Sequence, residues 1–248
     1  MKVDHRELQV RLKKAALLFW QARIQQATSQ KSRGTRDQGS RGAVIGGTQM
    51  DGFIRLISDL ITEAGLPETC IHRNAELELP GYFRPTKKWD LVAVSNRELV
   101  AAIEAKSQVG PSFGNNFNNR TEEALGSAAD IWTAYREGAF GCSPRPWIGY
   151  LFLLEDSPKS RSPVSVAEPH FEVFPEFRNA SYVKRYEILC RKLVRERHYE
   201  SAAFLTSPNP SGKVVTINES AEDLAFVRFA ASLVAHISAF GTMSGDRS

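Results

Sequence analysis

Residues 99–108 read LVAAIEAKSQ, an apolar run that ends in a carboxylate and an ammonium group separated by a single alanine. Side chains of an extended chain alternate between two faces, so Glu104 and Lys106 share one face with Val100 and Ala102. We therefore predict a buried β-strand that presents a charged pair near its end.

The segment before this strand predicts its partner. Residues 89–94, WDLVAV, have the composition of a strand, and residues 95–98, SNRE, have that of a turn. A hairpin closed by this turn would bring Asp90 to the same sheet surface as Glu104 and Lys106. Glu98 is a weaker competing acid, because it falls in the expected turn.

Other periodic segments surround the hairpin. Apolar faces at helical spacing predict helices over residues 7–25, 51–65, 120–138, 181–198 and 221–240, and residues 146–156 predict a strand buried on both faces. Residues 25–49 predict a mobile segment, and residues 110–119 a polar loop. This order of elements predicts an α/β fold in which helices flank a mixed central sheet.

Composition excludes several classes of protein. The chain has 248 residues, of which 42% are hydrophobic, enough to bury a sizeable core. Its start is charged where a signal peptide is apolar, and no apolar run approaches the ~20 residues that span a bilayer, so we expect a cytoplasmic protein with no membrane partner. The three cysteines match no metal-ligand spacing, and we expect reduced thiols in the core.

Positive charge is concentrated at the N-terminus. Residues 1–50 hold ten Lys and Arg against three Asp and Glu, a local charge of +7 in a chain whose net charge is +4. Such asymmetry suits a polyanion, and an arm carrying Arg33, Arg36 and Arg41 could become ordered on DNA. A solvated tail explains the same charges.

The charged cluster predicts metal-assisted hydrolysis of a phosphodiester. Asp90 and Glu104 supply the hard oxygen ligands that Mg²⁺ prefers, and Lys106 would orient water or stabilise developing negative charge. Short charge patterns also occur by chance, and a salt bridge on an edge strand is the structural alternative.

A longer set of motifs resembles one family. The residues LPGYFRPTKKWDLVAV (79–94) and LVAAIEAKSQVGPSFGNNFNNRTEEALGSA (99–128), with GGTQMDGF (46–53) and ASYVKRYEILCRKL (180–193), resemble the XhoI-type type II restriction endonucleases. The resemblance covers nearly the whole chain. It implies a PD...(D/E)xK fold, with the active-site motif on Asp90, Glu104 and Lys106, although Trp89 stands where that motif has proline.

The resemblance also implies an activity and its partners. Members cut double-stranded DNA with Mg²⁺ at the palindrome CTCGAG, after the first C, which leaves a 5′ overhang of TCGA. We accordingly expect a homodimer and a cognate DNA methyltransferase that protects the same site. A repair or junction-resolving nuclease and a non-catalytic DNA-binding protein are the alternatives.

Further residues are candidates for DNA contact. Asn amides can pair with adenine and Arg with guanine, so the GNNFNNR segment offers base readers or phosphate clamps in Asn115, Asn116, Asn118, Asn119 and Arg120, unless it is only an Asn-rich turn. Arg84, Lys87 and Lys88 are expected to contact phosphate. Glu63, on the predicted helix 51–65, is a candidate accessory acid, although helix acids more often serve only capping or solvation.

No second domain boundary stands out in the sequence. We expect a single endonuclease domain over residues 1–248, with a basic N-terminal helix and flexible arm at 1–49. A catalytic core at about 50–156 and a C-terminal helical part at about 157–248 would follow.

Overall fold

The predicted hairpin forms and lies within the central sheet. In the computed structural model, which describes residues 4–33, 49–210, 212 and 214–245, strand β4 (Leu91–Ser95) pairs antiparallel with β5 (Glu98–Gln108). Asn96 and Arg97 make the turn with φ of 51° and 64°, the left-handed values that tight hairpin turns require. The turn prediction is confirmed.

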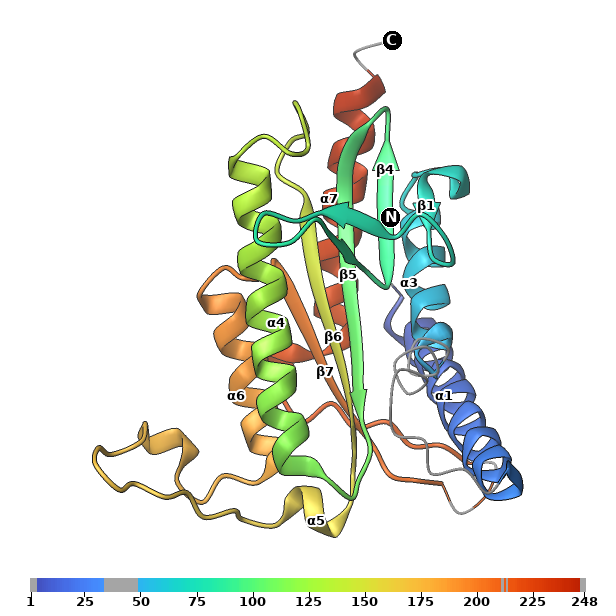
Figure 1. Ribbon diagram of the computed structural model, residues 1–248. Helices are drawn as coiled ribbons and strands as arrows, with labels where there is room; N and C mark the ends of the chain where they lie inside the picture. The colour runs from blue at the N-terminus through green and yellow to red at the C-terminus, as the bar shows by residue number, and fades with distance from the viewer. Residues whose placement is uncertain (1–3, 34–48, 211, 213, 246–248) are drawn as a thin grey trace.

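Five strands form the central sheet in the order β1-β4-β5-β6-β7 (Figure 1). β1 (Ile71–His72) pairs antiparallel with β4, whereas β6 (Trp147–Glu155) and β7 (Ser201–Ser207) continue the sheet parallel to β5. The buried strand predicted over 146–156 is thus confirmed. The sequence analysis did not predict β7, because periodicity cannot distinguish a short continuous apolar run from the end of a helix. The C-terminal part is therefore not purely helical.

Two helical layers cover the sheet (Figure 1). One apolar cluster joins its first face to α1 (His5–Arg33), α3 (Asp51–Glu63) and α7 (Phe226–Gly245). A second joins the other face to α4 (Phe113–Arg136) and α6 (Tyr182–Arg195). The predicted mixed sheet flanked by helices is confirmed. The short elements are α5 (Pro158–Arg161), β2 (Glu78–Pro80), β3 (Thr86–Lys88) and the 3-10 turns Glu68–Cys70, Pro175–Phe177 and Glu222–Leu224.

Two predicted loops are partly wrong. α1 continues through residues 25–33, where a mobile segment was expected, while residues 34–48, with Arg36 and Arg41, lie outside the described residues. α4 begins at Phe113, so most of the predicted polar loop 110–119 is helical. Phe113 and Phe117, one helical turn apart, pack on Tyr182 and Tyr186 of α6, with ring centroids 5.6 Å and 5.1 Å apart.

A β-bulge corrects the predicted face of Val100. Ala93 pairs with Ala101 and Val94 with Leu99, so Val100 is the extra residue on β5. Val100 therefore belongs to the cluster under α1, α3 and α7 instead of sharing the face of Glu104. The bulge leaves the alternation between residues 102 and 106 intact.

Helix α7 and the cysteines qualify two further expectations. By length and composition Phe226–Met243 could cross a membrane, contrary to the sequence-based expectation. Here Phe229 and Leu233 are fully buried in the apolar cluster, as in a core helix of a globular fold. The three cysteines are free thiols, but Cys142 is exposed, so the expected core location is wrong for it.

Candidate active site

Asp90 lies one residue before β4 and is held against β5. Its backbone N–H donates to the carbonyl of Ile103 (3.1 Å), which continues the hairpin ladder. Its carboxylate Oδ2 accepts from the Ala105 N–H (2.8 Å) and from Lys106 Nζ (3.1 Å). The backbone of one strand and the side chain of the other thereby orient this carboxylate.

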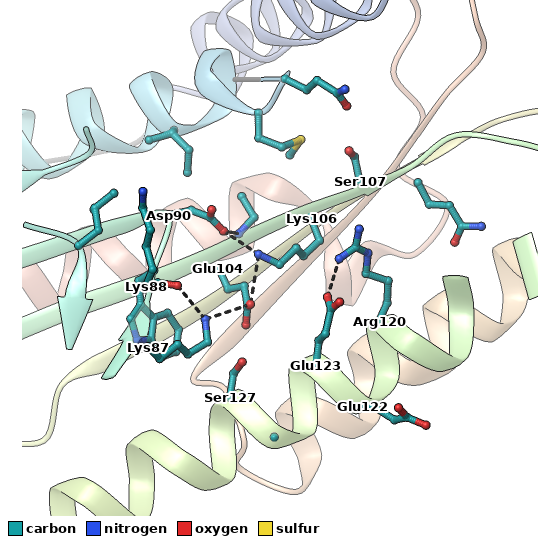
Figure 2. Close-up of a pocket in the computed structure, with 18 of the residues that line it drawn as sticks. Lys87, Lys88, Asp90, Glu104, Lys106, Ser107, Arg120, Glu122, Glu123 and Ser127 are labelled. Atoms are coloured by element: carbon teal, nitrogen blue, oxygen red, sulfur yellow. Dashed lines mark hydrogen bonds and ion pairs between the residues drawn. The ribbon is translucent and has the colours of Figure 1, made fainter. Parts of the chain in front are cut away.

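Glu104 points from β5 toward α4 and is almost completely buried, with 2% of its surface exposed. Its Oε1 lies 3.2 Å from the ammonium nitrogens of both Lys106 and Lys87. Figure 2 shows Lys106 extended between the carboxylates of Asp90 and Glu104, each joined to it by a dashed line. The structure thus brings together the three residues that the sequence nominated.

The charges of this cluster support one another. Burial alone would raise the pKa of Glu104, but the ammonium groups of Lys106 and Lys87 lower it below its usual value. Burial would lower the pKa of Lys106, but the carboxylates of Glu104 and Asp90 raise it above its usual value. Glu104 is therefore an anion and Lys106 a cation at neutral pH, although Glu104 is buried and Lys106 is half-buried.

Lys87 has a position that sequence reasoning missed. It was predicted to contact phosphate, but it turns inward from β3 to Glu104 and lies 4.2 Å from the centroid of the Trp89 ring. Burial lowers its pKa, and the Glu104 carboxylate only partly offsets that effect. The alternation of side chains in TKKW (86–89) indicates this inward position, because residues 87 and 89 share one face of an extended chain while residues 86 and 88 lie on the other.

Tyr199 forms a hydrogen bond with Glu104, and the sequence analysis did not identify it. It follows α6, and its hydroxyl donates to Glu104 Oε2 (2.9 Å) and lies 3.1 Å from the carbonyl of Ala124 in α4. Burial raises its pKa well above the usual value, so the phenol keeps its proton. The neighbouring Tyr150 ring lies 5.1 Å away, and its buried hydroxyl has no hydrogen-bond partner within the described residues.

A cleft of about 1370 Å³ opens above this cluster. Parts of α1, α3, the β2–β3 hairpin, the end of β5 and α4 between Asn116 and Asp130 line it. Of the predicted DNA contacts, those that line the cleft are Arg84, Lys87, Lys88, Asn116 and Arg120, whereas Asn115, Asn118 and Asn119 are exposed outside it. Helix α4 therefore presents only part of the asparagine-rich segment to the cleft.

The predicted helix acid, Glu63, does not line the cleft, whereas Asp51 of the same helix and several acids of α4 do. Glu63 lies at the far end of α3, where it pairs with Arg11 at 2.9 Å, and it does not line the cleft. Asp51, in the first turn of the same helix, does line it, and partial burial raises its pKa. The sequence does not show which end of this helix faces the cleft.

The donor set fits a hard divalent cation. Within the described residues, no three His, Cys, Asp or Glu side chains form a ready metal cluster. Asp90 and Glu104 nevertheless approach one cation, the Lys106 ammonium, at 3.1 Å and 3.2 Å. A small divalent ion prefers oxygen ligands such as these two carboxylates, which already converge on a single positive charge. Water and substrate oxygens would complete the coordination shell of the ion.

This fold and site define a nuclease of the restriction-endonuclease-like class. A helix-flanked mixed sheet carries an acid directly before one strand and a Glu-x-Lys pair on the adjacent strand, beside a cleft lined with basic side chains. The family model described as restriction endonuclease XhoI matches residues 29–218, and the chain belongs to this family. It is therefore a site-specific restriction endonuclease, a hydrolase acting on double-stranded DNA.

Curated relatives agree with this assignment. The type II restriction enzyme BstVI of Geobacillus stearothermophilus is 52% identical over 212 residues, 84% of this chain and 95% of that protein. XhoI of Xanthomonas vasicola is 50% identical over 178 residues, 71% of each chain. AbrI of Azospirillum brasilense is 51% identical over 172 residues, 69% of this chain and 77% of that protein. No solved structure matches the chain.

Proposed function

We propose that this endonuclease cuts both strands of the palindrome CTCGAG after the first C, with Mg²⁺, leaving TCGA overhangs. The observation that carries the catalytic part is the convergence of Asp90 and Glu104 on Lys106 Nζ at the wall of the cleft. The target sequence is the one that the resemblance to the XhoI-type family implies. The 50% identity with XhoI supports this choice.

Each residue of the cluster receives a role from its position. Asp90 and Glu104 would hold the Mg²⁺, which when bound polarises the phosphate and lowers the pKa of water. Lys106 would orient the attacking water and stabilise negative charge on the phosphate, because its ammonium is held by two carboxylates and stays protonated. Together with Lys106, Lys87 would keep Glu104 ionised and so able to act as a metal ligand.

The assembly follows from the symmetry of the target. A two-fold palindrome is most simply read by a homodimer in which each subunit cuts one strand. Asn116 and Arg120, which line the cleft from α4, are the strongest candidates for base contacts, and Lys88 for a phosphate contact. We further propose a single endonuclease domain, a cytoplasmic location and a methyltransferase that protects the same sequence.

Sequencing the ends of digested DNA tests the target. We expect Mg²⁺ and protein to linearise a plasmid with one CTCGAG site, and every end to read TCGA. A matched plasmid with one base pair of the site changed should stay intact. Cutting at another sequence would refute the proposed target. Cutting confined to branched DNA would indicate a junction-resolving nuclease. Binding of DNA without any cutting would indicate a non-catalytic DNA-binding protein.

The hydroxyl of Tyr199 is expected to matter for cleavage. Tyr199→Phe removes the donor to Glu104 Oε2, and such supporting hydrogen bonds change metal affinity or activity by about 10–100-fold. We expect a cleavage rate lower by about tenfold and weaker Ca²⁺ binding by calorimetry. Tyr150→Phe is the matched control, because that hydroxyl has no partner among the described residues. Equal behaviour of the two variants would exclude a positioning role for Tyr199.

A further inference from the structure

A rigid hairpin tip carries two exposed aromatic rings beside the cleft. β2 and β3 pair antiparallel and form a separate two-stranded sheet, and residues 81–85 connect them. In Figure 1 this hairpin crosses in front of β5 toward α4. Tyr82 and Phe83 at its tip are 53% and 72% exposed. The two rings therefore form an exposed aromatic pair at the tip of the hairpin.

Asp130 of α4 fixes the tip. Its nearly buried carboxylate accepts from the backbone N–H groups of Tyr82 (2.7 Å) and Phe83 (2.9 Å) and from Arg84 Nε (2.6 Å). Burial would raise the pKa of this carboxyl, but these three hydrogen bonds lower it below its usual value. Gly81 permits the close approach, since a Cβ there would lie 2.7 Å from Asp130 Oδ2. The rings are exposed on a fixed backbone instead of a loose loop.

The tip is close to the proposed catalytic cluster. Phe83 lines the cleft, and four residues farther along the hairpin Lys87 contacts Glu104. At ~3.3 Å per residue, the backbone at Phe83 lies within about 13 Å of the backbone at Lys87, whose side chain reaches Glu104. A duplex rises ~3.4 Å per base pair, so the rings can contact DNA a few base pairs from the phosphate that is cut.

The charge around the rings identifies their partner. Lys88 is exposed on the same hairpin, the partly exposed Arg84 adjoins Phe83, and all three line the cleft. Basic side chains interleaved with aromatic rings suit a nucleic acid, whose phosphates and bases they contact together. An apolar side chain that inserts at a base step partly unstacks it and kinks the duplex.

We propose that Phe83, supported by Tyr82, stacks into a base step of the bound duplex within a few base pairs of the cut and unstacks that step. This inference rests on the proposed function in one respect, namely that duplex DNA binds in the cleft. The two rings lie edge to face with centroids 5.0 Å apart, so Tyr82 supports the Phe83 ring. The DNA kink would be a specificity device, because base steps differ in the cost of unstacking.

Fluorescence of 2-aminopurine, which rises when the base loses its stacking neighbours, tests the proposal. Duplexes with the site that the end sequencing identifies would carry one analogue at successive positions around the cut, with Ca²⁺ replacing Mg²⁺. We expect wild-type protein to brighten one position. Phe83→Ala should lose most of that rise and weaken binding by about tenfold, while Phe83→Trp retains both.

Phe171→Ala is the matched control, because Phe171 is 88% exposed and does not line the cleft. Thermal unfolding of Phe83→Ala should match that of wild type, since the ring is mostly exposed. The proposal is overturned if wild-type protein cuts the unlabelled duplex yet brightens no position, or if Phe83→Ala brightens it equally. Loss of the dimer in Phe83→Ala by sedimentation would assign the rings to a second copy of the chain. Failure of wild-type protein to bind or cut any duplex would overturn the proposed function itself.

Discussion

Lys106→Ala is expected to lower the rate of DNA cleavage by about a thousandfold. The substitution removes the only ammonium that contacts both Asp90 and Glu104 within the described residues, together with the charge proposed to stabilise the phosphate. Glu104→Gln should have a comparable effect, because an amide is a poor ligand for a hard cation and cannot pair with Lys106 and Lys87 as an anion. Single-turnover cleavage of a duplex carrying the site measures both rates.

A matched pair of lysine variants separates catalysis from general loss of charge. Lys159→Ala removes an exposed ammonium in α5, outside the cleft, and should leave the cleavage rate unchanged. Gel-shift binding in Ca²⁺ should show that Lys106→Ala still binds the duplex. Cleavage at the wild-type rate by Lys106→Ala would rule out the proposed roles of this cluster.

Phe152→Ala is expected to destabilise the fold by about 3–5 kcal/mol. Phe152 is fully buried on β6, the strand next to Lys106, and stacks on Tyr186 of α6 with ring centroids 4.1 Å apart. Truncation would leave a cavity between the sheet and α6 that neighbouring side chains cannot fill. At about 2–4 °C per kcal/mol for a chain of this size, the melting temperature should fall by about 10 °C.

The exposed Phe171 supplies the comparison for this stability prediction. Phe171→Ala makes the same chemical change on the surface, and we expect a shift within about 0.5 kcal/mol. Calorimetry of wild-type protein and the two variants measures the difference. Equal melting temperatures for Phe152→Ala and wild type would contradict the packing of α6 on β6.

The central hairpin could be predicted because its signals are local. Alternating side chains in residues 99–106, the turn composition of residues 95–98 and the Glu-x-Lys spacing all lie within one short stretch. The structure keeps that arrangement, with Asp90 within hydrogen-bond distance of both Ala105 and Lys106. Only the bulge at Val100 departs from simple alternation, and it precedes the charged pair.

Helix α4 shows where local signals are insufficient. Its first turns contain four asparagines, whose side chains compete with helical hydrogen bonds, so the sequence favours a loop there. Phe113 and Phe117 pack on Tyr182 and Tyr186, nearly 70 residues later, and that contact accompanies the helical conformation. Tertiary packing overrides a local propensity in this case.

The sequence by itself determined the hairpin, the identity of its acid and its Glu-x-Lys pair, and the family. Only the tertiary structure decided that Lys87 and Tyr199 also hold Glu104, that Asp51 instead of Glu63 lines the cleft, and that Asp130 anchors the exposed rings at the hairpin tip. The physical reason is separation along the chain. Contacts between neighbours follow from backbone geometry and composition, whereas Glu104 and Tyr199 are 95 residues apart and meet only once the sheet and both helical layers have packed.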